Sequence, residues 1–310
     1  MVALSVSAKP SQAQTPTALR LNVLGCGRVG TTLAALWQRA GLCQVQQFYS
    51  RSVPSAMKAA RFVGAGAVVT QMAELQAADV WMLSVPDSQV EAVAQALATL
   101  PLPSPSQALP QTRPQPPTVF HCSGFLSSGS LAALASQGWQ VASAHPVFNF
   151  ADPAQCVDQF AGTPCGLEGD AAATALLHSL LTGVGGSCFP VDAQAKPLYH
   201  AAAVFSSNFM AVLQAVAREA WHAAGVPEAL IPDMHRSLLQ GSVQNLLTLG
   251  PAKAITGPAA RGDSAVVSAQ AERVMQWHPE AAELYQMMSV LARRLATTGA
   301  TTPATQVLTP

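Results

Sequence analysis

Short apolar runs alternate with longer amphipathic segments along the first part of the chain. The runs with strand character are 21–24, 45–49, 67–70, 79–85, 118–121, 139–144, 163–168 and 187–191. Segments with helical periodicity separate most of them, at 29–40, 54–62, 72–77, 89–100, 130–137 and 171–181. Strands that alternate with helices predict βαβ units and a parallel sheet.

After residue 191 the pattern contains helices only, at 197–224, 232–249, 264–277 and 279–297. We therefore predict an α/β fold with a Rossmann-type parallel-sheet domain at 19–191 and an all-helical C-terminal domain at 192–297. The ends, 1–18 and 298–310, lack apolar periodicity and are predicted to be disordered tails. The Pro-rich stretch 101–117 is predicted to be a surface insertion inside the first domain.

The most informative motif is a glycine turn between the first strand and the first helix. Gly25, Gly27 and Gly30 have G-x-G-x-x-G spacing, which is typical of dinucleotide-binding turns. In such turns the pyrophosphate lies at the helix N-terminus, where free N–H groups and the helix dipole favour an anion. The predicted cofactor contacts here are Gly25, Cys26, Gly27, Arg28, Val29 and Gly30. The alternative is a glycine turn with a structural role only.

The end of the second strand bears on the type of dinucleotide. Folds that select NAD place an acidic residue about 20 residues after the glycines, but this chain has Ser50, Arg51 and Ser52 there. Two hydroxyls and a guanidinium suit a 2′-phosphate, so NADP is favoured, with NAD possible. A solvated arginine in a polar loop is the alternative. Ser84, Val85 and Pro86 end a strong strand where the nicotinamide ribose is expected to pass.

Composition narrows the class of protein. Half of the residues are hydrophobic, 10% are charged and the net charge is zero, so neither nucleic acid nor a membrane is an expected partner. Polar residues interrupt the most apolar long segment, 197–217, which is predicted to be a buried helix. The six cysteines form no C-x-x-C pair, as expected for free thiols in the cytoplasm. No Cys/His cluster suggests a metal. An apolar chain with few charges also indicates a subunit interface.

One face of the first C-terminal helix carries candidate catalytic groups. His200 and Ser207 lie within about 40° of Lys196 around a continuous helix, and Asn208 lies near them. Together they are expected to line a cleft and face the nicotinamide. The alternative is a lysine in a capping interaction and a histidine that packs in the core.

Two other histidines, His121 and His145, terminate predicted strands. Ligands bind at the carboxyl ends of strands in open α/β sheets, and histidine can act as a general acid or base near neutral pH. Either residue is therefore a candidate for proton transfer in a hydride reaction. A structural turn histidine is an equally good interpretation of each.

The loop 256–263 combines polar groups with glycines. Arg261 is a candidate clamp for a substrate carboxylate, and Thr256 is a second candidate contact with the substrate. Equally, Asp263 or Ser264 in the same loop can cap the next helix.

Several stretches together resemble the Rossmann-like proteins that carry a DUF2520 domain. The matching stretches are GCGRVG, HCSG, AHP at 144–146, KPLYHAAAVFSSNF from Lys196, and TGPAARGD from Thr256. That family is similar to pyrroline-5-carboxylate reductase and to the 6-phosphogluconate and β-hydroxyacid dehydrogenases. The resemblance implies a Rossmann domain, a helical domain that forms a homodimer, and a nicotinamide cofactor. The K-x-x-x-N pattern of hydroxyacid dehydrogenases is not matched, because His200 stands four residues after Lys196.

These observations predict an NADP(H)-dependent oxidoreductase that acts on a small, carboxylate-bearing keto acid, hydroxy acid or imine. His200 or Lys196 would handle the proton, Ser207 and Asn208 would orient the substrate, and Arg261 would hold its carboxylate. The alternatives are a non-catalytic NADP(H)-binding sensor or regulator, and a protein that uses a flavin-like coenzyme.

Overall fold

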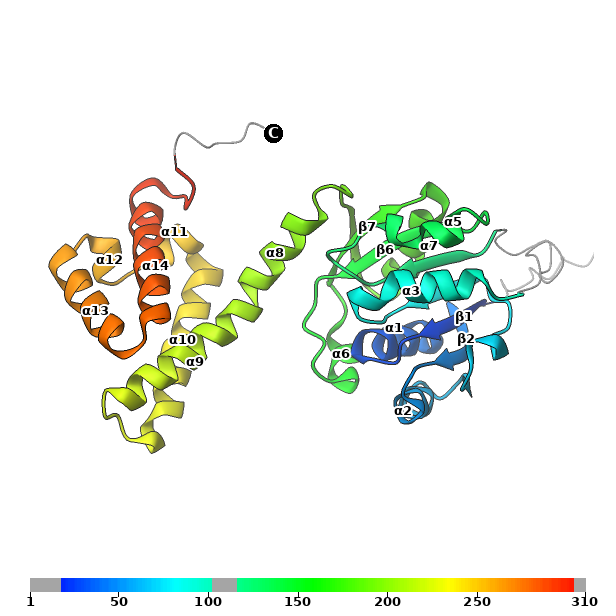
Figure 1. Ribbon diagram of the computed structural model, residues 1–310, viewed down its shortest axis with the longest axis horizontal. Helices are drawn as coiled ribbons and strands as arrows, with labels where there is room; N and C mark the ends of the chain where they lie inside the picture. Colours follow the sequence, from blue (N-terminus) through cyan, green and yellow to red (C-terminus); the bar gives the residue numbers. More distant parts are fainter. Residues whose placement is uncertain (1–17, 102–115, 304–310) are drawn as a thin grey trace, which may run out of the picture. The chain divides into compact units, whose positions relative to one another are not determined.

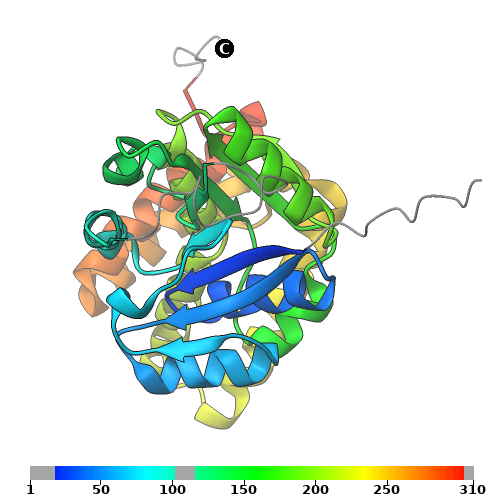
Figure 2. The ribbon, with the colours of Figure 1, turned by 90° about the vertical axis from the view of Figure 1, so that its right-hand side faces the viewer.

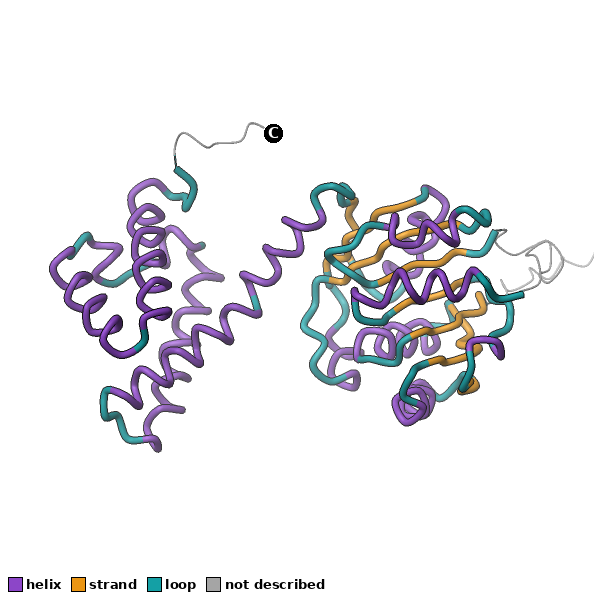
Figure 3. The backbone as a smooth tube through the Cα atoms, in the orientation of Figure 1, coloured by secondary structure: helices purple, strands orange, loops and turns teal. Residues whose placement is uncertain are grey.

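The computed structural model describes residues 18–101 and 116–303. The predicted tails, at 1–17 and 304–310, and most of the Pro-rich insertion, at 102–115, lie outside the described residues. The chain divides into two compact units, the first ending at Ala203 and the second beginning at Val204. All described strands belong to the first unit, and the second contains helices joined by loops (Figure 1, Figure 3).

The described part of the first unit contains one eight-stranded sheet with the order β3-β2-β1-β4-β5-β6-β7-β8. Figure 2 shows β1 and β2 side by side in the sheet. The strands are β1 (Leu19–Leu24), β2 (Cys43–Tyr49), β3 (Ala67–Val69), β4 (Val80–Leu83), β5 (Thr118–His121), β6 (Gln140–Pro146), β7 (Pro164–Gly169) and β8 (Ser187–Pro190).

The sheet is parallel, as predicted, except at one pair, because β7 runs antiparallel to β6. Every other pair of neighbouring strands is parallel. The segment between β6 and β7 turns back at the same edge of the sheet, where the N–H of Val147 donates to the carbonyl of Pro164 at 2.8 Å. Its helix α6 (Pro153–Gln159) packs on α1 instead of crossing the sheet.

Helices cover both faces of the sheet. One face packs against α1 (Arg28–Arg39), α2 (Val53–Val63) and α7 (Ala171–Thr182), and the other against α3 (Asp87–Ala98) and α5 (Ala132–Ala135). The predicted helix 72–77 is a short 3₁₀ helix, η1 (Met72–Glu74), and the predicted helix 130–137 consists of a 3₁₀ turn, η2 (Ser128–Leu131), followed directly by α5. The sheet is thus the middle layer of three.

The pattern of the central strands follows from this layering. In β4, Val80 and Met82 belong to one hydrophobic cluster, whereas Trp81 and Leu83 belong to the other. Side chains alternate across a strand, so a sheet covered on both faces needs a continuous apolar run. Each fully buried side chain of this kind contributes about 1.5–3 kcal/mol through the hydrophobic effect.

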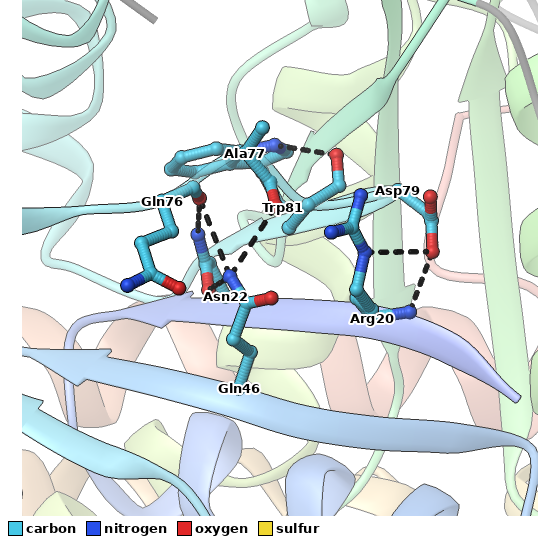
Figure 4. Close-up of polar contacts among 8 residues, drawn as sticks. Arg20, Asn22, Gln46, Gln76, Ala77, Asp79 and Trp81 are labelled. Atoms are coloured by element: carbon cyan, nitrogen blue, oxygen red, sulfur yellow. Dashed lines mark hydrogen bonds and ion pairs between the residues drawn. The ribbon is translucent and has the colours of Figure 1, made fainter. Parts of the chain in front are cut away.

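A polar network occupies the amino end of β1 and β4 (Figure 4). The Asn22 amide donates to the carbonyl of Gln76 at 2.7 Å and accepts from Gln46 at 3.3 Å. The backbone N–H of Arg20 donates to the buried carboxylate of Asp79 at 2.7 Å. These bonds satisfy buried polar groups and fix the segment between β3 and β4.

The helix after residue 191 differs from the prediction. A break at Ser207, with φ −128° and ψ −61°, separates α8 (Lys196–Ser206) from α9 (Asn208–Ala223). The first unit includes most of α8, beyond the predicted boundary at 191, because Lys196 is buried in it. Within the described residues, Lys196–Ala223 is the one helical stretch long and apolar enough, with mean hydropathy 1.3, to cross a membrane by composition.

The second unit also contains η3 (Glu228–Leu230), α10 (Ile231–Leu249), α11 (Pro251–Ala254), α12 (Pro258–Arg261), α13 (Ser264–Trp277) and α14 (Pro279–Thr298). Its buried hydrophobic residues are Ile231, Ala281 and Ala282 only, among the residues that the structure describes. The expectation that 197–217 is a buried helix is also wrong, since Lys196 is the one buried residue of α8 and α9. Their apolar side chains have little cover in a single chain.

Candidate functional site

The glycine turn has the geometry that its spacing predicts. Gly25 has φ +96°, and a Cβ on it would lie 2.6 Å from the backbone of Ser84. A Cβ on Gly30 would collide with the Ser84 side chain, whereas a Cβ on Gly27 would meet nothing within 4 Å. The first and third glycines therefore allow the turn and its helix to pack on β4. The second leaves its backbone open to an approaching ligand.

A pocket of about 370 Å³ lies beside this turn. It is lined by Leu24, Gly25, Cys26, Gly27, Tyr49, Ser50, Arg51, Ser55, Ser84, Val85, Pro86, Gln89 and Val93. Helix α1 begins at Arg28 without a side-chain cap and without an acidic residue in its first turn. Its first N–H groups are thus available to an anion. These features fit the pyrophosphate of a dinucleotide.

The predicted 2′-phosphate contacts take different roles. Ser52 is the N-cap of α2, since its hydroxyl accepts from the N–H of Ser55 at 3.4 Å. Ser55, which the sequence analysis did not single out, lines the pocket with Ser50 and Arg51. The Arg51 side chain is exposed and has no polar partner among the described residues. Because the lining contains no carboxylate, Arg51 is the charged group that an anion would meet there.

Most predicted cofactor residues line the pocket, namely Gly25, Cys26, Gly27, Ser50, Arg51, Ser84, Val85 and Pro86. Arg28, Val29, Gly30 and Ser52 are not among the lining residues. Arg28, Val29 and Gly30 form the first turn of α1, so their backbone N–H groups are the contacts that this position offers. The hydroxyl of Ser84 donates to the carbonyl of Gly25 at 2.6 Å and holds the turn.

His121 has a structural role in the turn after β5. Its Nδ1 accepts from the N–H of Ser123 at 3.2 Å, and its Nε2 lies 3.0 Å from the carbonyl of Ser127. The ring is fully buried, and this burial lowers its pKa to about 4. Both nitrogens are engaged, so the expectation that His121 faces a ligand is wrong.

Three aromatic side chains meet above Gly124, in the turn after β5. The hydroxyl of Tyr199 lies 2.8 Å from Nδ1 of His145, and the rings of His145 and His200 are 5.7 Å apart. A Cβ on Gly124 would lie 2.6 Å from Nδ1 of His200 and 2.7 Å from Cε1 of His145. The absence of a side chain at Gly124 therefore lets the two imidazoles converge.

The two histidines differ in their hydrogen bonding. Nδ1 of His200 is buried and has no hydrogen-bond partner in the described part of the chain. A buried polar atom without a partner costs about 1–3 kcal/mol, and a bound ligand can satisfy it. Burial lowers the pKa of His145 to about 4, helped by the nearby His200 and Lys196. His145 is therefore neutral near pH 7.

Lys196 does not line an open cleft, contrary to the prediction. Its side chain is 1% exposed, and its Nζ donates to the hydroxyl of Ser143 at 2.7 Å and to the carbonyl of Ser123 at 3.1 Å. Burial lowers its pKa. The ammonium joins the first turn of α8 to β6 and to the turn before Gly124, so it positions the histidines instead of contacting a ligand.

The imidazoles and the glycine-turn pocket lie along the same edge of the sheet. β4, β5 and β6 are parallel neighbours, with Leu83 paired to His121 and His121 paired to Ser143. Ser84 follows Leu83 into the pocket, and His145 lies two residues beyond Ser143. Carboxyl ends of parallel strands form the ligand-binding edge of such sheets. A dinucleotide extended from β1 past β4 would approach the histidine pair.

The remaining predicted site residues belong to the second unit. The Ser207 hydroxyl donates to the side-chain oxygen of Asn208 at 2.9 Å, at the start of α9. Because α8 ends at Ser206, the continuous helical face that was predicted to join them to His200 does not exist. Arg261 forms an exposed ion pair with Asp263 at 3.0 Å, and Thr256 is exposed.

No group of three or more metal-ligating side chains occurs in the residues that the structure describes. Tyr199 and Gly124 are site residues that were not predicted from the sequence, although they stand inside the stretches KPLYHAAAVFSSNF and HCSG. A glycine directly after a strand-terminal H-C-S is the signal for Gly124. Tyr199 carries no signal of its own, because its partner His145 is distant in sequence.

Comparisons with known proteins agree with this architecture. Residues 6–146 match the family model of the Rossmann-like domain, and residues 163–291 match that of DUF2520, a domain of unknown function. The chain carries a Rossmann-like domain followed by a DUF2520 domain. The resemblance inferred from the motifs is thereby confirmed. No curated protein has a matching sequence.

Solved structures share the fold. A protein from Thermotoga maritima is 25% identical, with TM-score 0.68, and the match covers 90% of this chain and 99% of that one. A protein from Bacteroides fragilis, provisionally described as an NADP oxidoreductase, is 22% identical with TM-score 0.68, over 90% and 100% of the two chains. A 1-pyrroline-5-carboxylate reductase from Streptococcus pyogenes is 15% identical with TM-score 0.55, over 90% and 100%. The chain thus has the fold of NAD(P)-dependent oxidoreductases.

Proposed function

We propose that this protein is an NADP(H)-dependent oxidoreductase for a small, carboxylate-bearing keto acid, hydroxy acid or imine. The observation that carries the proposal is that the pocket and two histidines lie along the same edge of the sheet. There, the pocket beside the glycine turn is followed, two strands on, by His145 and His200. A dinucleotide site next to titratable groups in a sheltered turn is the arrangement that a hydride transfer with proton exchange requires.

The cofactor assignment follows from the pocket. The open backbone at Gly27 and the uncapped start of α1 would hold the pyrophosphate. Arg51 and Ser55 would hold a 2′-phosphate, because charge-assisted hydrogen bonds from a guanidinium suit that group. When bound, the nicotinamide supplies or accepts the hydride at C4. The bound dinucleotide would then pass along Ser84 to Pro86, from the pocket toward the turn at Gly124.

His145 and His200 are the groups proposed to exchange the proton. Nδ1 of His200 lacks a protein partner, so this atom is available to a substrate. Ser207, Asn208 and Thr256 remain proposed substrate contacts from the second unit. Arg261 remains the proposed carboxylate clamp and would exchange its partner Asp263 for the substrate.

The direct test measures NADPH oxidation with a panel of 2-keto acids and cyclic imines, for the wild type and for His200→Ala. We expect turnover with at least one compound, and loss of at least about tenfold in kcat for the variant with NADPH affinity unchanged. Full activity of His200→Ala would remove His200 from the mechanism. NADPH binding without turnover on any compound would favour the sensor, and lack of NADPH binding would favour another coenzyme.

The helical unit is proposed to form a homodimer. Leu247 is 82% exposed, Phe205 71% and Met287 60%, and a unit with so few buried residues needs further apolar cover. Light scattering should give twice the chain mass for the wild type and for Met57→Glu on α2, and a monomer for Leu247→Glu. A monomeric wild type would contradict this proposal. The six free thiols suit a reducing compartment, and we place the protein in the cytoplasm.

A further inference from the structure

The hydroxyl of Tyr199 is held against His145 by its surroundings. Tyr199 lies in the first turn of α8, three residues after the buried Lys196 that joins this helix to β6. On β7, a Cβ at Gly166 would lie 2.9 Å from the Tyr199 hydroxyl oxygen, so a glycine makes room for the phenol. The rings of Tyr199 and His145 meet edge to face, with centroids 5.4 Å apart.

Counting donors and acceptors gives the direction of their 2.8 Å hydrogen bond. A phenol has one proton to donate, and Nδ1 of His145 is the only acceptor for it among the described residues. If Nδ1 carried a proton, that proton would point at the phenol oxygen and the phenol proton would have no acceptor. The arrangement that gives the phenol proton an acceptor has Tyr199 donating to an unprotonated Nδ1, which places the imidazole proton of His145 on Nε2.

The charges around His145 keep this ring neutral. The titratable groups that act on it are Tyr199, His200 and Lys196 from α8 and Asp87 from the start of α3. Burial lowers the pKa of His145 to about 4, the neighbouring His200 and Lys196 lower it further, and Asp87 opposes this shift. Burial also raises the pKa of Tyr199 to about 12, so the phenol keeps its proton. For a neutral imidazole, the tautomer decides which nitrogen can donate.

We infer that Tyr199 is a positioning residue that holds His145 as the neutral tautomer with its proton on Nε2. No hydrogen bond within the described residues uses Nε2 of His145, so this N–H is available to a ligand. The site then offers a directed, uncharged donor beside the unpartnered Nδ1 of His200. That the donor serves a carbonyl or imine rests on the proposed function, whereas the tautomer does not.

The test is a long-range ¹H–¹⁵N correlation spectrum of the full-length protein labelled with ¹⁵N-histidine, recorded without added ligand from pH 4 to 8. His145→Gln assigns the resonances. We expect wild-type His145 with its proton on Nε2 and with no protonation above pH 5. In Tyr199→Phe we expect loss of this preference, with both tautomers populated. Tyr285→Phe, which removes a phenol bonded to Gln270 in the second unit, should leave His145 unchanged.

A proton on Nδ1 in the wild type would overturn the inference, and this outcome needs no variant to fold. An unchanged His145 tautomer in a folded Tyr199→Phe protein would overturn it as well. NADPH titration of the same samples separates the two proposals. An Nε2–H tautomer in a protein that does not bind NADPH would support the role of Tyr199 and contradict the proposed function.

Discussion

The hydroxyl of Ser84 donates a 2.6 Å hydrogen bond to the carbonyl of Gly25 and so closes the glycine turn against the neighbouring strand. The same side chain occupies the space that a Cβ on Gly30 would need. A Cβ on Gly25 would instead meet the Ser84 backbone at 2.6 Å, and Gly25 has a positive φ of +96°. Gly27 is therefore the glycine whose role is toward the ligand.

Two alanine substitutions separate folding from binding at this turn. In Gly30→Ala the new methyl collides with Ser84, so we expect the free energy of unfolding to fall by about 1–3 kcal/mol. Gly27→Ala adds a methyl into open space at an ordinary φ of −78°, so stability should hold while NADPH binding is lost. Urea denaturation and fluorescence titration measure the two effects. Equal loss of stability in both variants would contradict this division of roles.

Gly124 is expected to control the geometry of the histidine pair. A methyl there would push on Nδ1 of His200 and Cε1 of His145, and displacement of reacting groups by about 1 Å can cost on the order of 100-fold in rate. Gly124→Ala should therefore lower kcat and shift the imidazole resonances of both histidines, while NADPH affinity stays unchanged. Gly241→Ala, where a Cβ meets nothing within 4 Å, is the matched control. Wild-type resonances in Gly124→Ala would refute the argument.

We expect Lys196 to stabilise the folded protein and not to contact a ligand. Lys196→Ala removes the buried ammonium that donates to Ser123 and Ser143, and leaves the Ser123 carbonyl with the Ser143 hydroxyl as its donor at 3.2 Å. It also opens a cavity beneath α8, so the free energy of unfolding should fall by about 2–5 kcal/mol. Lys253→Ala on α11 removes an exposed lysine and should change it by less than about 0.5 kcal/mol. Urea denaturation measures the free energy of unfolding of both variants and of the wild type. A Lys196→Ala protein as stable as the wild type would show that the ammonium is not needed to dock the helix.

His121 gives the fold a defined sensitivity to acid. Its pKa is about 4 in the folded chain, against 6.5 for the free side chain. Between these values the unfolded chain binds a proton that the native chain does not, so its contribution to stability, up to about 3 kcal/mol, is present above pH 6.5 and lost as the pH falls toward 4. His121→Gln should be less stable at pH 7 and should show a flatter decline. A parallel decline in both proteins would contradict this origin.

Much of the fold could be predicted, because it is local in the sequence. Each local pattern predicts the element that its own residues form. Examples are the apolar runs of β1 and β4, the glycine spacing before α1 and the helical periodicity after residue 191. The reversal of β7 could not be predicted, because it depends on where the segment after Pro146 turns back. The break at Ser207 was also hidden, since the apolar pattern continues through it.

The candidate site was predicted in part. The pocket residues near Gly25 and Arg51 follow from one local motif and one strand end. Lys196 and His121 were predicted to face a ligand, but both side chains form buried hydrogen bonds within the protein. Their partners could not be identified from the sequence. The pairing of Tyr199 with His145 joins a helix to a distant strand, so it appears only in three dimensions.

We propose that the pocket beside the glycine turn binds NADP(H) through the 2′-phosphate of the cofactor. Fluorescence titration with NADPH and NADH tests it, using the wild type, Arg51→Ala and, as control, Arg61→Ala from the far end of α2. We predict tighter binding of NADPH than of NADH. Arg51→Ala should weaken NADPH about 10–100-fold, as for loss of charge-assisted hydrogen bonds worth about 1.5–3 kcal/mol, with NADH affinity unchanged. No binding of NADPH, or equal affinity for it in Arg51→Ala and the wild type, would contradict the account.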